Sequence, residues 1–282
     1  MKIGFLGPKG TFSQHAAKMY LKESNIEPQM ISYGNFADLI LGVHEKKIDE
    51  AVLPVENSIE GPVNITLDML AWDVALKIKR EIDLPIRHNV MVRDVNANIT
   101  CILSHPQAIG QCRNFLNRYF SDIPIQYTYS TTQAAEKVAA GQSTKDGEQW
   151  AAIAAEKAAE AYDLKIIHRD IQDYDNNVTR FIVLSHRDVE KAEKDDANVF
   201  KTSIIFSTDD KPGSLYKILQ ILNLWDINMT KIESRPAKEN LGSYIFFVDI
   251  EGHREDEHIK DALTMIKRKT SFFKMLGSYY TI

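Results

Sequence analysis

The sequence predicts an α/β protein built from a two-lobed region and a smaller C-terminal module. Short apolar strands alternate with helical patterns through the first ~170 residues, which is typical of a largely parallel sheet. Eight of the ten residues from 187 to 196 are charged, which indicates a solvated linker. Beyond them the predicted order of elements is βαββαβ, the ferredoxin-like arrangement. A chain of 282 residues is long enough for these parts.

The first round of elements forms the first lobe. Longer extended segments at Ala75–Asp83 and Arg87–Val92 would carry the chain into a second lobe. The strand Phe181–Leu184 would return to the first lobe, so a small ligand could be buried between lobes that close by a hinge. The predicted elements of the first round are strands at Lys2–Leu6, Gln29–Tyr33 and Ala51–Pro54, and helices at Phe12–Glu23 and Phe36–Glu45.

The second round forms the second lobe, and a polar loop at 141–149 interrupts it. Its first helix places Ile109, Cys112, Leu116 and Tyr119 on one face, which predicts their burial. Cys112 is therefore interpreted as a core residue rather than a functional thiol. The predicted elements are strands at Thr100–Ser104, Ile125–Tyr129 and Ala151–Ala154, and helices at Ile109–Tyr119, Gln133–Ala139 and Ala155–Tyr162.

The C-terminal module has two helices with the same apolar spacing, so both should cover one face of a four-stranded sheet. The spacing residues are Leu215, Ile218, Leu219 and Leu222 in the first helix, and Ile259, Ala262, Leu263 and Ile266 in the second. The predicted strands are Thr202–Ser207, Met229–Ser234, Ser243–Ile250 and Phe272–Thr281.

Composition excludes several classes of function. A net charge of −5 and a pI of about 5.9 give no support for a nucleic-acid or anionic-membrane partner. No apolar run reaches the ~20 residues of a membrane span, and the first residues form a strand rather than a signal peptide. Cys101 and Cys112 are not in a CxxC pair, which favours reduced thiols in the cytoplasm. No metal-ligand spacing is present, so we expect no metal.

Two polar clusters directly follow strands of the first lobe. In the first, Gly7–Ser13, either Thr11 or Ser13 could cap the next helix, and free N–H groups there could also hold an anion. The second, 54–68, contains two prolines and a glycine that stiffen it. A plain turn and a binding loop are equally good interpretations of it. Its polar groups are Glu56, Asn57, Ser58, Asn64 and Thr66.

Three further clusters lie at strand ends. Ser104 could cap the helix that Pro106 begins, and Gln107 and Gln111 share a face of that helix. Thr132 belongs to 130–133, which caps another helix start. Thr179 and Arg180 place a weak acid beside a cation. Apart from Thr179 and Arg180, which begin a strand, these clusters lie at the carboxyl ends of strands, where open α/β sheets bind ligands. Their hydroxyls and amides, with few charges, fit a small anionic substrate. No serine or cysteine has a histidine base beside it, so nucleophilic catalysis is not indicated.

Six segments, in order, resemble the signatures of the prephenate dehydratase family across almost the whole chain. Four lie in the two-lobed region: GPKGTFS, PVENSIEGPVNITLD, SHPQAIGQC and NNVTRF. The C-terminal module resembles an ACT regulatory domain. Gly213-Ser214-Leu215 corresponds to the Gly-Ala-Leu element of that domain, with serine in place of alanine, and Glu233-Ser234-Arg235-Pro236 corresponds to its ESRP element.

The resemblance implies a fold class and a set of domain boundaries. The fold would be α/β, with a two-lobed, periplasmic-binding-protein-like catalytic region and a ferredoxin-like ACT domain. The catalytic domain would span 1–185, with lobe 1 at about 1–84 and 172–185 and lobe 2 at about 85–171. A linker at 186–200 would lead to the ACT domain at 201–282.

The resemblance also implies a reaction, in which prephenate loses water and carbon dioxide to give phenylpyruvate without a cofactor. Thr179 would donate to the departing hydroxyl. Catalytic roles also fall to Glu56, Asn57, Ser104, Gln107 and Gln111. Substrate binding falls to Arg180, Thr11, Ser13, Ser58, Asn64, Thr66, Thr132 and Phe181, and whether Arg180 binds a carboxylate or braces the loop is left open.

Regulation follows from the same resemblance. L-Phenylalanine would bind where two ACT domains meet, so the protein should be a homodimer or a homotetramer. The implied pocket residues are Gly213, Ser214, Leu215, Glu233, Ser234 and Arg235. The alternatives are an arogenate dehydratase and a catalytically inactive protein that binds aromatic metabolites. We expect no chorismate mutase segment to accompany the chain.

Overall fold

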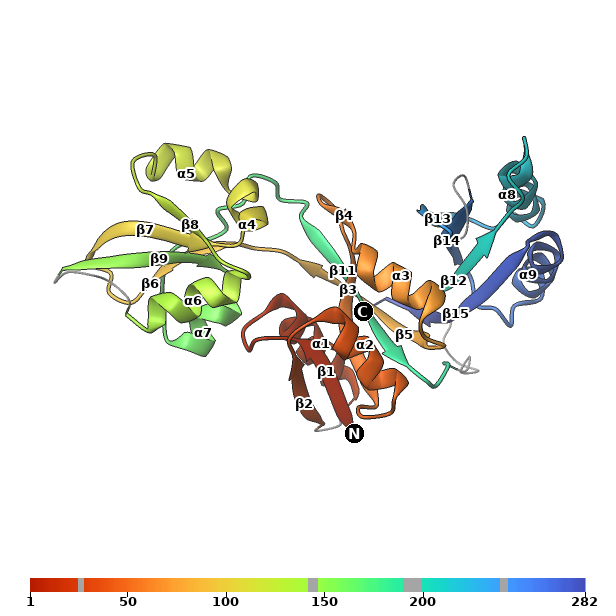
Figure 1. Ribbon diagram of the computed structural model, residues 1–282, viewed down its shortest axis with the longest axis horizontal. Coiled ribbons are helices and arrows are strands. Elements are labelled where there is room, and N and C mark those ends of the chain that lie inside the picture. The colour runs from red at the N-terminus through yellow and green to blue at the C-terminus, as the bar shows by residue number, and fades with distance from the viewer. Residues whose placement is uncertain (25–27, 142–146, 190–198, 239–242, 282) are drawn as a thin grey trace. The chain divides into compact units, whose positions relative to one another are not determined.

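The computed structural model describes residues 1–24, 28–141, 147–189, 199–238 and 243–281 (Figure 1). The charged run at 187–196 lies largely outside these residues, as does most of the polar loop at 141–149. The chain forms two compact units. The first contains 1–39, 52–63 and 83–181, and the second contains 40–51, 64–82 and 182–282. No helix among the described residues is long and apolar enough to cross a bilayer.

The first sheet has the strand order β2-β1-β3-β11-β5, with the short β4 paired to β3. β1 and β2 run parallel, and β3 and β4 form an antiparallel hairpin. Its strands are β1 (Lys2–Leu6), β2 (Gln29–Tyr33), β3 (Glu50–Asn57), β4 (Gly61–Pro62), β5 (Lys77–Pro85) and β11 (Val178–Ser185). The helices in the same part of the sequence are α1 (Phe12–Ser24), α2 (Phe36–His44) and α3 (Asn64–Trp72).

The second sheet has the order β10-β6-β9-β7-β8 and lies entirely in the first unit. Side chains alternate across its strands, so Leu103 and Ala152 pack on one pair of helices while Ile102 and Ile153 pack on the other. Its strands are β6 (Asn89–Val92), β7 (Asn98–Ser104), β8 (Ile125–Tyr127), β9 (Glu148–Ala154) and β10 (Lys165–His168). The helices are α4 (Pro106–Gln111) and α5 (Arg113–Tyr119) on one face, and α6 (Thr131–Ala139) and α7 (Glu156–Tyr162) on the other (Figure 1).

The third sheet is antiparallel, with the order β13-β14-β12-β15, and belongs to the second unit. Its two helices lie side by side on one face and share a core with Ile204, Phe206 and Val248 (Figure 1). The predicted βαββαβ order is therefore confirmed. The elements are β12 (Phe200–Ser207), α8 (Ser214–Leu224), β13 (Met229–Pro236), β14 (Tyr244–Glu251), α9 (Glu257–Lys269) and β15 (Phe272–Tyr280).

The structure corrects three local predictions. The predicted helix 109–119 is two helices, because Cys112 leaves helical geometry at φ −116° and ψ 19°. Tyr119 is consequently 54% exposed instead of buried, and its ring stacks on that of His168. Asn64–Trp72 is a helix rather than part of a loop, and it buries Leu67 and Leu70. The strands β4 and β10 were not predicted.

Candidate functional site

The site is built where the end of β3 lies beside the start of β11. The Asn57 Nδ2 atom donates a hydrogen bond to the Thr179 hydroxyl oxygen at 2.9 Å. Thr179 is 9% exposed, so its hydroxyl is largely shielded from water. Because the oxygen of Thr179 accepts from Asn57, its O–H remains able to donate to another group. The amide of Asn57 therefore lies beside the hydroxyl of Thr179, a contact that the sequence did not predict.

The orientation of the Asn57 amide is fixed by the backbone. Its Oδ1 accepts from the N–H groups of Ile59 and Glu60, each at 3.0 Å, in the turn that joins β3 to β4. A backbone N–H can only donate, so the oxygen must face the turn and the NH₂ group must face β11. The turn therefore decides that Asn57 is a donor to Thr179.

The same NH₂ group begins a chain of buried polar side chains. Asn57 donates to Asn177 Oδ1 at 2.8 Å, and Asn177 Nδ2 donates to Gln111 Oε1 at 2.8 Å. Gln111 Oε1 also lies 3.0 Å from His88 Nε2, and Gln111 Nε2 donates to Glu60 at 3.1 Å. Asn177 is 1% exposed and His88 is 3% exposed. These hydrogen bonds connect Gln111 of α4, and His88 directly before β6, to Thr179.

Charge is sparse in this site. The Arg180 guanidinium lies 3.6 Å from the Glu56 carboxylate, and both side chains are partly exposed. Burial lowers the pKa of His88, although its hydrogen bond to Gln111 opposes the shift. Burial also lowers the pKa of His105, against the attraction of Glu60. The side chains that lead by hydrogen bonds to Thr179 are thus mainly amides, those of Asn57, Asn177 and Gln111.

The first polar cluster is used to begin α1. Thr11 Oγ1 accepts from the Gln14 N–H at 3.2 Å, so Thr11 rather than Ser13 is the cap. The Gly10 N–H donates to the Gln14 side chain at 2.7 Å. Ser13 is buried at 6% exposure. These contacts support the capping interpretation, and one N–H that could have held an anion is occupied.

The structure corrects the predicted cap of α4. His105, not Ser104, is the N-cap, and its Nδ1 accepts from the Gln107 N–H at 3.3 Å. The Ser104 hydroxyl is fully buried and donates to the Ile153 carbonyl at 2.7 Å. The Gln107 side chain is exposed, whereas Gln111 is buried. Of the third cluster, only Gln111 joins the chain that leads to Thr179.

The remaining predicted site residues are spread over several elements. Ser58 donates to the Asn176 carbonyl at 2.8 Å and accepts from the Val178 N–H, so it ties the β3–β4 turn to β11. Thr132 is 1% exposed, and its hydroxyl has no hydrogen-bond partner among the described residues. Ser130 caps α6 at 3.0 Å, as predicted. Asn64 and Thr66 lie in the first turn of α3, and Phe181 is a core side chain of β11.

Three residues of the site were missed by the sequence analysis: His88, Asn177 and Glu60. His88 lies in the segment predicted only to be extended. Asn177 and Glu60 fall inside recognised segments, but nothing in their spacing separates them from their neighbours. The position of Asn177 inside NNVTRF, two residues before Thr179, was the one available signal for it.

Cysteine and metal chemistry are not supported by the described residues. Cys101 and Cys112 are both free thiols. Cys112 is fully buried, and burial raises the pKa of its thiol far above the ordinary value, as expected for the predicted core role. Within the described ranges, no group of three or more histidine, cysteine, aspartate or glutamate side chains could hold a metal ion.

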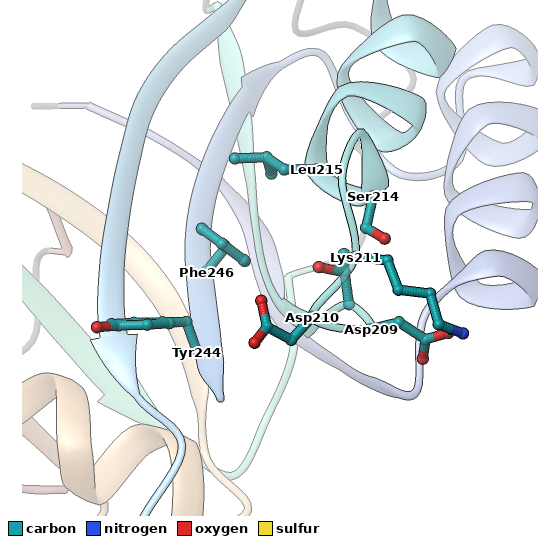
Figure 2. Close-up of a pocket in the computed structure, with 8 residues that line it drawn as sticks. Asp209, Asp210, Lys211, Ser214, Leu215, Tyr244 and Phe246 are labelled. Atoms are coloured by element: carbon teal, nitrogen blue, oxygen red, sulfur yellow. The ribbon is translucent and has the colours of Figure 1, made fainter. Parts of the chain in front are cut away.

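A second candidate site is a pocket of about 150 Å³ in the C-terminal module (Figure 2). It is lined by the loop from Thr208 to Lys211, by Ser214 and Leu215 at the start of α8, and by Tyr244 and Phe246 of β14. Ser214 and Leu215, both predicted, line this pocket. Gly213 adopts φ +79° as the cap of α8, a left-handed conformation that favours glycine.

The predicted residues of β13 are divided between two faces. Ser234 pairs with Phe246, whose side chain packs in the core beneath α8 and α9, so Ser234 belongs to the helix-covered face. Strand alternation places Glu233 and Arg235 on the opposite face. There the Arg235 guanidinium pairs with the Asp68 carboxylate of α3 at 3.0 Å. None of Glu233, Ser234 and Arg235 lines the pocket of Figure 2.

That opposite face is held to α3 and β5 by several charged contacts within the second unit. Lys274 donates to the Leu70 and Val74 carbonyls at 2.7 Å each, at the end of α3. Lys201 pairs with Glu81, which is fully buried, at 2.5 Å. Two aromatic contacts accompany these, Trp72 with Phe272 and Arg80 over the Tyr280 ring. We call this set of contacts the junction.

Fold and site together define a class: an α/β protein that presents hydroxyl and amide groups at strand ends and carries an ACT-type module. The prephenate dehydratase family model matches residues 3–189 and the ACT domain model matches residues 202–264. The chain belongs to the prephenate dehydratase family.

Individual relatives agree with this assignment. The chain is 41% identical to the bifunctional chorismate mutase/prephenate dehydratase of Aquifex aeolicus, over 99% of this chain and 73% of that protein. It is 38% identical to the prephenate dehydratase of Methanocaldococcus jannaschii, over 96% of this chain and 95% of that protein. A crystal structure of prephenate dehydratase from Arthrobacter aurescens in complex with L-Phe superposes with a TM-score of 0.87 at 30% identity, covering 99% and 90% of the two chains.

Proposed function

We propose that the protein converts prephenate to phenylpyruvate, carbon dioxide and water. The single observation that carries the proposal, beside family membership, is the hydrogen bond from Asn57 to Thr179. It leaves the Thr179 O–H free to donate to the hydroxyl that leaves the substrate ring. The ring becomes aromatic as carbon dioxide departs, so the enzyme has to position the substrate and stabilise the negative charge that develops on the departing oxygen.

The low charge of the site suits this chemistry. Decarboxylation disperses the charge of the ring carboxylate, so a tight ion pair with that group would stabilise the substrate more than the transition state. The Arg180 guanidinium lies 3.6 Å from the Glu56 carboxylate, and we assign it to the pyruvyl carboxylate. Glu56, Asn57 and Gln111 would orient the ring. Ser104, Gln107, Thr11, Ser13, Ser58, Asn64, Thr66, Thr132 and Phe181 remain candidates for supporting roles.

We also propose that L-phenylalanine inhibits the enzyme through the C-terminal module. In the pocket of Figure 2, Leu215, Tyr244 and Phe246 offer apolar surface for a ring, and the Asp210 carboxylate offers a partner for an ammonium group. The pocket is small and open, which is consistent with completion by the same module of a second copy. A homodimer or homotetramer is therefore part of the proposal, as is a cytoplasmic location for a protein with two free thiols.

Through the junction, a structural change at that pocket could be transmitted to the turn between β3 and β4, which begins at Asn57. β14 lines the pocket and pairs with β13, where Arg235 contacts Asp68 of α3. Helix α3 begins directly after β4, and β4 pairs with the end of β3, where Gly61 lies opposite Asn57. A shift of β13 on effector binding would thus reach Asn57 through α3. The proposal includes separate catalytic and regulatory domains at 1–185 and 201–282, joined by 186–200.

The test is to incubate the purified protein with prephenate and follow phenylpyruvate, with and without L-phenylalanine, with arogenate as a parallel substrate. Phenylpyruvate above the spontaneous rate, suppressed by L-phenylalanine, is the expected result. Phenylalanine produced from arogenate alone would transfer the proposal to that substrate. Turnover of neither compound would favour a catalytically inactive protein that binds aromatic metabolites.

A further inference from the structure

His88 is a buried histidine at the far end of the series of hydrogen-bonded side chains that reaches Thr179. His88 begins the lobe that contains β6, and its backbone is held on both sides: its N–H donates to Gln172 Oε1 at 3.0 Å, and its carbonyl accepts from Ile171 at 2.9 Å. Its ring meets Phe12 edge-on, with centroids 5.9 Å apart. The imidazole is thus fixed in place, with Nε2 3.0 Å from Gln111 Oε1.

The donor and acceptor pattern of the chain settles which ring nitrogen carries hydrogen. Backbone N–H groups orient Asn57, Asn57 donates to Asn177, and Asn177 donates to Gln111 Oε1. The atom of Gln111 that faces His88 is therefore an oxygen, which can only accept. His88 Nε2 must carry a hydrogen. The other ring nitrogen, Nδ1, is buried and has no hydrogen-bond partner among the described residues, which disfavours a proton there.

The opposite tautomer would reverse this pattern. An Nε2 without hydrogen would attract the NH₂ group of Gln111, so the Gln111 amide would turn over. Its NH₂ group would then face the NH₂ group of Asn177, and its oxygen would face the Glu60 carboxylate, two contacts between like groups. Both hydrogen bonds that hold Gln111 between the lobes would be lost.

We propose that His88 is a positioning residue for the dehydration, because its Nε2–H fixes Gln111 and Asn177 and thereby supports the hydrogen bond from Asn57 to Thr179. This inference rests on the proposed function. His88 itself does not contact the reacting groups. Its role is to fix the direction of hydrogen-bond donation along this series of side chains, so that the Thr179 hydroxyl is oriented to donate to the substrate.

The experiment compares two variants of the full-length protein. His88→Gln retains an N–H donor near the Nε2 position, whereas His88→Met has a similar length and no donor. His88→Met should lower kcat roughly 10-fold to 100-fold, below the loss expected for a donor that touches the substrate, with KM changed much less. His88→Gln should recover most of that loss. The matched control is His258, exposed on α9, where the same two substitutions should leave kcat unchanged.

A second measurement does not depend on activity. Imidazole ¹⁵N spectra of the histidine-labelled wild type, assigned by difference from His88→Gln, should show the neutral Nε2–H tautomer for His88. The Nδ1–H tautomer would overturn the proposal, and so would equal losses in the Met and Gln variants or no loss in either. A wild type inactive on prephenate that still shows the Nε2–H tautomer would instead count against the proposed function. If His88→Met does not fold, the tautomer measured for the wild type tests the proposal by itself.

Discussion

Two regions of the molecule use polar side chains in opposite ways. The chain from His88 to Thr179 is made of neutral groups, and its hydrogen bonds measure 2.8 to 3.0 Å. In the junction, charged side chains predominate, with Asp68 between Arg235 and Lys238, and Glu81 facing Lys201. The first region orients groups without creating a strong field. The second fixes one surface against another.

The difference follows from what each region has to do. A reaction that disperses negative charge gains little from a strong fixed cation near the carboxylate that is lost, whereas a directed hydroxyl donor helps throughout. In the regulatory role that we propose for the junction, a contact has to change its strength when β13 moves by a small distance. Ion pairs with desolvated partners respond steeply to distance and geometry, so they suit the junction.

The largest expected effect lies in the neutral chain. Thr179→Ala removes the donor that faces the departing hydroxyl, so kcat should fall on the order of 10²–10⁴-fold while substrate affinity changes much less. Thr179→Ser keeps the hydroxyl and should retain most of the activity. Steady-state kinetics on prephenate measure both. An alanine variant with near-normal kcat would remove Thr179 from the mechanism.

The charged junction should affect regulation more than catalysis. Asp68→Asn leaves Arg235 and Lys238 without their carboxylate, so the concentration of L-phenylalanine for half inhibition should rise several-fold, within the roughly 5–150-fold range of typical coupling. The kcat without effector should stay near the wild-type value. Inhibition curves measure both quantities, and Glu160→Gln, which breaks the exposed pair with Lys157, is the control. Unchanged inhibition would contradict the route through α3.

The junction should also contribute to stability. Glu81→Leu removes a fully buried carboxylate that pairs with Lys201 and accepts from Thr281 at 2.8 Å. The unfolding free energy should fall by roughly 1–3 kcal/mol, less than for a fully buried pair because Lys201 is partly exposed and can reach water. Denaturant unfolding measures the change. The double variant Glu81→Leu/Lys201→Leu should recover part of it, and a larger loss in the double variant would refute the pairing.

The smallest expected effect is a pH dependence of stability that originates in the neutral chain. Burial lowers the folded-state pKa of His88, so the unfolded chain binds a proton more readily once the pH falls below about 6.5. Stability from this group is complete above that pH and decreases as the pH falls toward the folded pKa. His88→Gln should therefore lose less stability than the wild type between pH 7.5 and pH 5.5. Equal losses in denaturant unfolding would show that His88 is not held neutral.

The sequence by itself determined the fold class, the βαββαβ module and most elements. It did so because the spacing of apolar residues within one segment indicates which side chains are buried. Cys112, for example, is buried as its helical spacing predicts. The polar clusters were also readable, since strand ends in α/β sheets place such groups together. Asn57 and Gln111 lie in such clusters, whereas Thr179, at the start of β11, was singled out as a hydroxyl beside Arg180. Helix α3 was missed because Gly61, Pro62 and the polar residues of its first turns obscure its apolar spacing.

The tertiary structure alone decided which of these residues form one hydrogen-bonded chain and which face a strand residue takes. His88, Asn177 and Glu60 join the site through contacts between distant segments, and amides and imidazoles carry no local signal of their partners. Arg235 faces Asp68 rather than the pocket because the register of β13 against β14 sets its side. A shift of one residue in the pairing would move the Arg235 side chain to the other face of the sheet. The sequence of β13 by itself does not determine which residues of β14 it pairs with.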